Sequence, residues 1–346
     1  MLISQKALLF LGNILLLWVV INTFVTDSFG IALILSATII GAIQYVRIPP
    51  LHPSKISESI EALFKVDHKN HIKSTIFHKA GGYHAPENTL EAIRQAISLG
   101  IPAVEIDLEI TSDGVGVLHH GPELQTTTDG NGRISEVTYD YIRTLNAAAH
   151  HPNKDKFPVA NVPTIDECLR LCVENSLVVF IDCKSDAQRT AKMIADLYQK
   201  YPELYGLGIV CSFYPNLIYS VRQADSNIVT AVTHRNLYIT LANDEGDEER
   251  NKELWKRILA PFADALLAWG HTALFWMLCG NSFFLCNKNK ISRDLKIFYE
   301  RLGVRLVAWT VNKPLEKQFL LDHLGIPVIT DGINMPSLNR SQGETP

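Results

Sequence analysis

The sequence predicts an α/β protein: a closed (β/α)8 TIM barrel with a small insertion after strand 2, preceded by an N-terminal transmembrane hairpin. Three observations support this fold class. Eight short apolar runs alternate with helix-length amphipathic stretches, which is typical of parallel strands joined by crossover helices. A further run follows the second one too closely for a crossover connection. Two long uncharged segments stand before the first strand.

The composition excludes some classes of function. The 346 residues carry a formal net charge of −4 at pH 7, so the chain has no basic field for nucleic acid, although a small phosphate ligand remains compatible with it. The six cysteines are scattered, and Cys168 and Cys172 lie one helical turn apart on an expected helix. This spacing gives no disulfide or zinc framework, and buried free thiols are the favoured interpretation.

The first element is a membrane anchor over residues 1–47. Residues 7–25 and 28–46 are each uncharged and about as long as a bilayer-spanning helix requires. A signal peptide would have a shorter apolar core, and a single span with a re-entrant piece is the remaining alternative. The hairpin predicts an integral, multi-pass protein of an endomembrane or the plasma membrane. Positive charges after the hairpin favour a cytosolic barrel, but together with one glycosylation sequon in the tail they leave the side open.

The barrel is expected to span residues 74–335, after a proline-stiffened linker over 48–73 and before a polar tail over 336–346. Its expected strands are 75–78, 103–109, 178–184, 208–213, 229–234, 283–286, 305–311 and 327–330. Helix-length stretches between them include 88–99, 187–200, 215–223 and 293–301. A doubly wound open sheet is the alternative, and it is disfavoured because no G-x-G-x-x-G follows the first strand.

A hairpin strand over residues 115–120 interrupts the alternation. Only the four residues TSDG separate it from Ile110, where the apolar run of the second strand ends, so it returns antiparallel to that strand. The surrounding segment, about 111–163, predicts an insertion mounted over one mouth of the barrel.

The second irregular segment, about 258–285, is richer in Trp, Phe and Leu than an outer barrel helix needs. Asp264 and His271 interrupt it, which disfavours a third membrane span. Trp255, Trp269 and Trp276 suit the headgroup level of a bilayer. We therefore expect this segment to associate with the membrane surface.

Polar residues at the C-terminal strand ends predict the active site. Glu105 and Asp107 are two residues apart on one strand and so share a face, and Asp182 and Lys184 repeat this spacing on the next barrel strand. Buried carboxylates repel one another unless a cation holds them, so three converging acids predict a hard divalent ion, Mg²⁺ or Ca²⁺. Salt bridges to arginines behind the sheet are the alternative, which two acidic pairs at neighbouring strands make less favoured.

Histidines supply candidate proton-transfer groups at the same end of the barrel. His78 ends the first strand and His120 ends the hairpin strand, so they can flank the acidic cluster. Side chains alternate along the hairpin strand, so only one of His119 and His120 can face the site.

These residues lie in ordered motifs: HKAGGYHAPENTLEAI, VEIDLEITSDGVGVLHHGPELQTTTDGNG, FIDCK, CSF, VAWTVN and ITDGI. With them the chain resembles the glycerophosphodiester phosphodiesterase family, and its membrane segment resembles the family's membrane-anchored animal branch. The resemblance implies metal ligands at Glu105, Asp107 and Asp182, a catalytic pair of His78 and His120, and substrate-binding residues at Lys79, Glu87, Asn88, Lys184 and Trp309. Lys79 stands where the family usually has an arginine. The family spacing also selects His120 over His119.

The resemblance implies metal-dependent hydrolysis of glycerophosphodiesters to glycerol phosphate and an alcohol at a membrane. The first alternative is a lysophospholipase D-type cleavage of lysophospholipids or N-acyl glycerophosphoethanolamines. The second is a catalytically weak membrane binding or scaffold protein. The expected partners are accordingly a small-molecule or lysolipid phosphodiester and membrane lipids, without nucleic acid.

Overall fold

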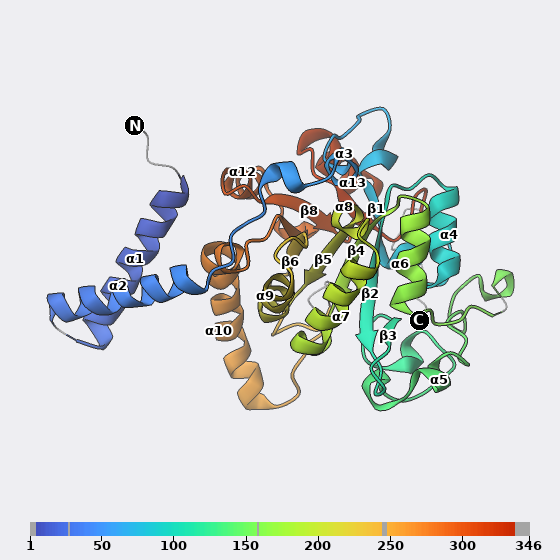
Figure 1. Cartoon of the computed structure of the whole chain (residues 1–346), viewed down its shortest axis with the longest axis horizontal. Helices are drawn as coiled ribbons and strands as arrows, with labels where there is room; N and C mark the ends of the chain where they lie inside the picture. Colours follow the sequence, from blue (N-terminus) through green and yellow to red (C-terminus); the bar gives the residue numbers. More distant parts are fainter. Residues whose placement is uncertain (1–4, 27, 158, 244–247, 336–346) are drawn as a thin grey trace, which may run out of the picture.

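The computed structural model describes residues 5–26, 28–157, 159–243 and 248–335. A barrel surrounded by helices forms the main body, and two N-terminal helices project from one side of it (Figure 1). The polar tail predicted for 336–346 lies outside the described residues.

Eight parallel strands close the predicted barrel. They run in the order β1 (Thr75–Phe77), β2 (Ala103–Ile110), β4 (Val178–Cys183), β5 (Gly208–Ser212), β6 (Thr230–His234), β7 (Phe283–Asn287), β8 (Arg305–Trp309) and β9 (Val328–Thr330). β1 pairs in parallel with both β2 and β9, which removes both edges of the sheet. The closed barrel is thus confirmed, and the open sheet is excluded.

Amphipathic helices cover the outside of the barrel. They include α4 (Leu90–Ser98), α6 (Ile165–Glu174), α7 (Ala187–Lys200), α8 (Leu204–Leu207), α9 (Pro215–Ala224), α12 (Arg293–Arg301) and α13 (Pro314–Gln318). Side-chain caps fix several starts: Thr89 accepts a bond from the Ala92 amide, and Thr164 with Glu167 forms a capping box. The four predicted helices agree with the observed ones to within two residues at each end.

Alternation along β2 separates two apolar layers. Val104, Ile106 and Leu108 point outward and pack under the helices. Ala103 points inward and joins the interior cluster at the N-terminal end of the barrel. The polar residues between them therefore point into the barrel near its other end.

The segment predicted as a linker is folded against the barrel. Its helix α3 (Glu58–Leu63) places Ile60 and Leu63, both fully buried, in the interior cluster, where they cover the N-terminal end of the strands. Glu61 on α3 forms a two-pronged ion pair with Arg305 of β8, at 2.7 and 2.8 Å. Residues 48–73 thus differ from the expectation because a helix of six residues is too short to show an amphipathic period.

The predicted insertion follows β2. β3 (Gly116–Leu118) pairs antiparallel with β2, and α5 (Tyr139–Ile142) lies beyond it at the lower right of Figure 1. The insertion has a small apolar cluster of its own, which includes Leu124, Ile134 and Ile142. The pairing of β3 with residues 108–110 places the insertion beside the C-terminal end of β2.

Two apolar helices precede the barrel: α1 (Gln5–Phe24) and α2 (Phe29–Val46). Among the described residues, α2 is the one helix long and apolar enough to cross a membrane, with a mean hydropathy of 2.0, and Leu11–Phe24 forms a shorter apolar helix. The two helices contact each other, and the rings of Trp18 and Phe29 meet edge to face at 5.4 Å.

The chain that leaves α2 is clamped onto the barrel. The Val46 carbonyl accepts a hydrogen bond from the Tyr219 hydroxyl at 2.6 Å, and the Ile48 amide donates to Leu278 at 2.8 Å. The buried guanidinium of Arg222 donates to the Pro49 carbonyl at 2.7 Å. Gly280 has no room for a Cβ here, because that atom would lie 2.6 Å from the Ile48 carbonyl oxygen.

The aromatic-rich segment 258–285 divides into two parts that behave differently. Its first part belongs to α10 (Leu254–Gly270), which carries an exposed apolar face. Its second part passes through a π-helical turn (His271–Phe275) and α11 (Trp276–Cys279) into β7, where Phe283 and Leu285 fill the barrel interior. From Phe283 onward the segment therefore forms the strand that the sequence also predicts over 283–286, and membrane association stays a prediction for the part that precedes it.

Candidate active site

The acidic residues of β2 and β4 meet inside the barrel. Asp107 and Asp182 are direct partners in the parallel register of the two strands. Glu105 precedes Asp107 by two residues and so points to the same side. One carboxylate oxygen from each residue lies within 4.8 Å of the others, and all three side chains are buried.

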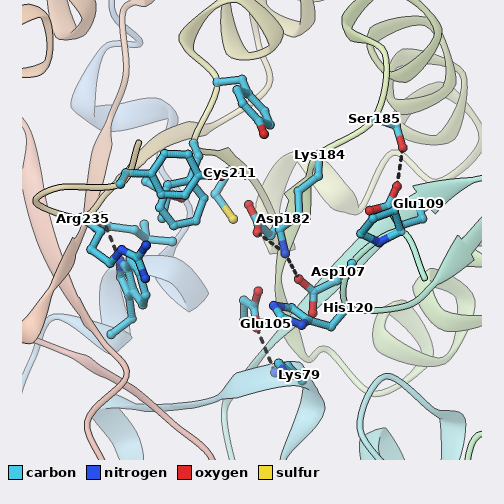
Figure 2. A pocket seen from close by; sticks show the side chains of 18 of the residues that line it. Lys79, Glu105, Asp107, Glu109, His120, Asp182, Lys184, Ser185, Cys211 and Arg235 are labelled. Atoms are coloured by element: carbon cyan, nitrogen blue, oxygen red, sulfur yellow. Dashed lines mark hydrogen bonds and ion pairs between the residues drawn. The ribbon is translucent and has the colours of Figure 1, made fainter. Parts of the chain in front are cut away.

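Lys184 is the cation nearest to this cluster. Its Nζ contacts Asp107 Oδ1 and lies 3.1 Å from Asp182 Oδ2 (Figure 2). Burial and repulsion from Asp107 raise the pKa of Glu105 to about 8. Burial likewise raises the pKa of Asp182 to about 6, although Lys184 opposes the shift. One ammonium thus does not balance the charges of the cluster.

The donor set of this cluster suits a hard divalent cation. Asp182 Oδ1 is buried and has no hydrogen-bond partner among the described residues. A buried carboxylate oxygen without a donor is costly unless a cation meets it. Three converging carboxylates are ligands that Mg²⁺ and Ca²⁺ accept.

The turn after β1 shapes one side of the cluster. The backbone at Lys79 and Ala80 is left-handed, with φ of 51° and 62°, and this turns the Lys79 amide toward Glu105 Oε2 at 2.8 Å. Gly81 follows at φ 100°, where a Cβ would lie 2.5 Å from the Phe77 ring. Gly81 is therefore required for the turn that follows His78.

Glu87 and Asn88 lie behind two residues that line the cavity, Lys79 and Asp107. The Lys79 ammonium bonds the Glu87 carboxylate at 3.1 and 3.2 Å. Asn88 donates from Nδ2 to Asp107 Oδ2 at 2.9 Å and accepts the Asp107 amide at 3.0 Å. Neither is among the residues that line the cavity. In the structure they hold residues that line the cavity, and their expected contact with substrate stays a prediction.

His78 is oriented by a residue from the last strand end. Its Nδ1 lies 2.6 Å from Asp331 Oδ1, and Asn312 donates from Nδ2 to the other Asp331 oxygen. Burial alone would lower the pKa of His78, but the bond to Asp331 and the charge of Glu105 outweigh it, so the pKa is raised. Because Nδ1 is occupied, Nε2 is the nitrogen left for chemistry.

His119 and His120 directly follow β3 and point in opposite directions. His119 is buried, with Nδ1 2.8 Å from the Gly121 carbonyl and Nε2 2.9 Å from the Thr127 hydroxyl. His120 lines the cavity beside Asp107, as Figure 2 shows. Desolvation within the cavity lowers the pKa of His120 to about 3, because Asp107 offsets it only in part.

The cavity around these groups has a volume of about 1070 Å³. Eight of the predicted site residues line it: His78, Lys79, Glu105, Asp107, His120, Asp182, Lys184 and Trp309. On one side, Phe213 stacks on Tyr238 at 4.5 Å and meets Trp309 edge to face at 5.5 Å. On the other side, Glu109 accepts a bond from Ser185 at 2.7 Å. The acidic cluster thus lies between an aromatic wall and a polar wall.

Sequence reasoning missed several residues of this site. Asp331 stood in a quoted motif directly after the last strand, and the strand-end rule that selected Asp182 also applies to it. Phe213 follows β5 in the same way. Tyr238 lies in a long loop and has no periodic signal, so the sequence offered no means of finding it.

A closed parallel barrel with acids and histidines gathered at the C-terminal ends of its strands is the arrangement of a barrel enzyme. Residues 78–335 match the glycerophosphoryl diester phosphodiesterase family. The match runs from the turn directly after β1 to the residues that follow β9. The chain therefore belongs to this family and is a phosphoric diester hydrolase, as predicted.

Similar proteins from animals extend over most of the chain. Glycerophosphodiester phosphodiesterase 1 from Bos taurus is 41% identical over 260 residues, which are 75% of this chain and 78% of that protein. The Homo sapiens protein of the same name is 39% identical over the same shares.

Solved structures support the fold. A putative glycerophosphoryl diester phosphodiesterase from Silicibacter pomeroyi has a TM-score of 0.57 at 20% identity, covering 75% of this chain and 89% of that one. A phosphodiesterase from Oleispira antarctica, solved with its product sn-glycerol-3-phosphate, has a TM-score of 0.57 at 19% identity, covering 74% and 92%. The likeness to these two structures concerns the barrel.

Proposed function

We propose that this chain hydrolyses a glycerophosphodiester to glycerol phosphate and an alcohol, with a divalent metal and at a membrane. The observation that carries the proposal is the cluster of three buried carboxylates with two histidines in one cavity. The product named for the Oleispira antarctica enzyme supports glycerol phosphate as the product here.

The two histidines differ in the direction of their pKa shifts, which suggests separate roles. The pKa of His120 is lowered, so its imidazole is neutral at pH 7 and serves as the base that takes a proton from the attacking hydroxyl. The bond to Asp331 raises the pKa of His78, which favours a proton on Nε2, and we assign His78 the delivery of that proton to the departing alcohol oxygen. The phosphorus–oxygen bond to the alcohol breaks as the bond to the attacking oxygen forms. The attacking oxygen belongs either to water, which gives glycerol phosphate directly, or to the substrate's own glycerol hydroxyl, which gives a cyclic phosphate that water then opens.

Charged side chains would hold the phosphate between these histidines. Glu105, Asp107 and Asp182 would bind Mg²⁺ or Ca²⁺, which when present supplies positive charge to a phosphoryl oxygen. Lys184 lies beside two of these acids and would contact the phosphate as well. Lys79 is held by Glu87 and would add a second cation on the opposite side.

The N-terminal helices would anchor the enzyme in the bilayer. α2 has the length and hydropathy of a span, and α1 packs against it to complete a hairpin. We therefore propose an integral, multi-pass protein of an endomembrane or the plasma membrane.

A lysophospholipid is the second candidate substrate. The specific observation in its favour is the aromatic wall of Trp309, Phe213 and Tyr238, which could receive an acyl chain. Cleavage at the head group would then release a lysophosphatidate.

The deciding experiment uses the full-length protein in bilayers. Glycerol phosphate release from glycerophosphoinositol and lysophosphatidate release from lysophosphatidylcholine are measured with EDTA and after addition of Mg²⁺ or Ca²⁺. We expect release from glycerophosphoinositol that EDTA abolishes and one of the ions restores. Release from lysophosphatidylcholine alone would favour the second candidate. No release from either substrate would favour a binding or scaffold protein.

A further inference from the structure

We propose that the exposed face of α10 lies on the bilayer surface as a second membrane contact, separate from the α1–α2 hairpin. The face consists of Leu254, Trp255, Ile258, Phe262, Leu266 and Trp269. Its occupant is the interfacial layer of lipid headgroups and upper acyl chains. The docking itself does not depend on the proposed reaction.

The exposure of this face is unusual for a folded surface. Leu254, Ile258, Phe262 and Leu266 are 69, 57, 66 and 70% exposed, and they recur every four residues along one helix. Isolated exposed apolar side chains are ordinary, but a continuous row of large ones marks a contact surface. Trp255 and Trp269 lie near the two ends of the row, and tryptophan suits the headgroup level.

The opposite face of α10 is fixed to the barrel. Asp264 is buried and accepts bonds from the Ile239 amide at 2.8 Å and from the Thr240 amide at 2.9 Å. Ala260 and Gly270 are buried on the same side. α10 therefore cannot rotate to hide its apolar row without breaking these bonds.

The position of α10 relative to α2 favours lipid as the occupant. Figure 1 shows α10 on the side of the barrel from which the α1–α2 hairpin projects, and it runs crosswise to α2. A spanning helix follows the membrane normal, whereas an interfacial helix lies in the membrane plane. The clamp at Val46, Ile48 and Pro49 holds this arrangement. When α2 spans, the bilayer therefore lies against the face of α10.

The helix is built to lie on a bilayer rather than to cross it. α10 has 17 residues and contains Pro261 and the buried Asp264. A second copy of the chain could cover an apolar row in solution, but the side that carries α2 is the side that lipid occupies. Lipid contact accordingly needs no additional partner.

This docking would place the cavity mouth near the membrane. The Ile239 and Thr240 amides donate to Asp264, and these bonds hold the loop that contains Tyr238. The Tyr238 ring belongs to the aromatic wall. The Arg250 guanidinium lies 4.6 Å from the same ring, a few residues before α10 begins. The aromatic side of the cavity is therefore the side connected to the membrane-facing helix.

The test uses the full-length protein in vesicles of phosphatidylcholine. Phe262→Cys is labelled with an environment-sensitive fluorophore, and Tyr141→Cys on α5 serves as the matched control, an exposed aromatic position across the molecule from α10 (Figure 1). The six native cysteines are buried, so they label poorly. Lipids that carry a spin label near the headgroup act as quencher.

We expect the label at position 262 to be quenched by the spin-labelled lipid and the label at position 141 to remain unquenched. Equal, water-like emission at both positions would overturn the proposal. A different result would overturn the proposal in favour of contact between two copies of the chain. In that result the label at position 262 is shielded from water but is not quenched by the lipid, and labels on neighbouring copies quench one another until unlabelled protein is added.

A second variant separates docking from catalysis. Phe262→Glu with Leu266→Glu should make a label at position 258 accessible to water, while hydrolysis of soluble glycerophosphoinositol stays within a few-fold. An unchanged lipid-quenched signal at position 258 in this variant would contradict the assignment of the face. Loss of hydrolysis in the unsubstituted protein would refute only the proposed function, because the quenching does not require turnover.

Discussion

His78 and Asp331, 253 residues apart in the chain, lie 2.6 Å from each other across the junction where β1 meets β9. Closure of the barrel therefore joins the first strand end to the last. The Asp331 carboxylate fixes the ring orientation of His78 and favours its protonated form. Asn312 holds this aspartate in turn, because its Nδ2 donates to Asp331 Oδ2 and its Oδ1 accepts the Asp331 backbone amide at 3.0 Å.

Asp331→Asn should weaken catalysis through His78. The substitution removes the charge that raises the His78 pKa, so the alkaline limb of the activity profile should move to lower pH. Turnover should fall at least ~10-fold with little change in KM, since general acid catalysis contributes ~10²–10⁴ and only its support is lost. The measurement is kcat and KM against pH. A lower kcat with an unshifted pH profile would point to a merely structural role.

His120→Ala and His119→Ala should differ strongly. His120 lines the cavity, so its loss should lower turnover by ~100-fold or more. The His119 side chain bonds the Gly121 carbonyl and the Thr127 hydroxyl of the insertion, and the His119 bond to the Asp107 carbonyl comes from its backbone amide, which alanine keeps. Its loss should therefore leave turnover within a few-fold. Steady-state assays of both variants decide the matter. The reverse ranking would assign the catalytic role to His119.

Asp107→Asn should abolish both metal-dependent turnover and stabilisation by the metal ion, without unfolding the protein. Mg²⁺ or Ca²⁺ should raise the melting temperature of the unsubstituted protein, because an ion bound only by the folded state stabilises it. The variant lacks one ligand charge, so this increase and the turnover should both be lost. An activity that persists in EDTA, or an ion-induced increase that the variant retains, would disprove the metal assignment.

The buried pair of His234 and His271 predicts an acid-sensitive fold. Their Nδ1 atoms are 3.0 Å apart, and Lys290 lies 2.9 Å from His234 Nε2. Burial lowers the pKa of His234 to about 4 and that of His271 to about 3, and Lys290 and the second imidazole contribute to the shifts. Asn236 Oδ1 lies 3.2 Å from the same His234 nitrogen as an acceptor, and this contact and the charge of Asp264 both oppose the lowering of the His234 pKa.

Both folded pKa values lie below the ordinary value of about 6.5, so the unfolded chain binds more protons between pH 6.5 and 4. The stabilisation is complete above pH 6.5 and decreases as the pH falls, by roughly 1 to 2 kcal/mol per histidine at pH 5. His271→Leu should flatten this dependence in thermal melts at pH 7 and pH 5. An equal pH dependence in the variant would refute the prediction.

Strand periodicity was enough to predict the barrel and its acidic cluster. Glu105, Asp107 and Asp182 could be found because residues two apart share a face and parallel strands end at one edge. The contacts of Asn88 and Glu87 could not be predicted from the sequence, because each depends on a partner from another element. The role of Asp331 depends on closure across the whole chain, which no local pattern records.

The cover that α3 forms over the N-terminal end of the barrel determines where an autonomous soluble version of this enzyme can begin. The family match starts at His78, but β1 lies before it, and Ile60 and Leu63 fill the interior from further upstream. A protein shortened to the family boundary would lose a barrel strand and open an apolar channel to water. A version that begins soon after α2 would keep both, so the folding unit is longer than the unit of sequence similarity.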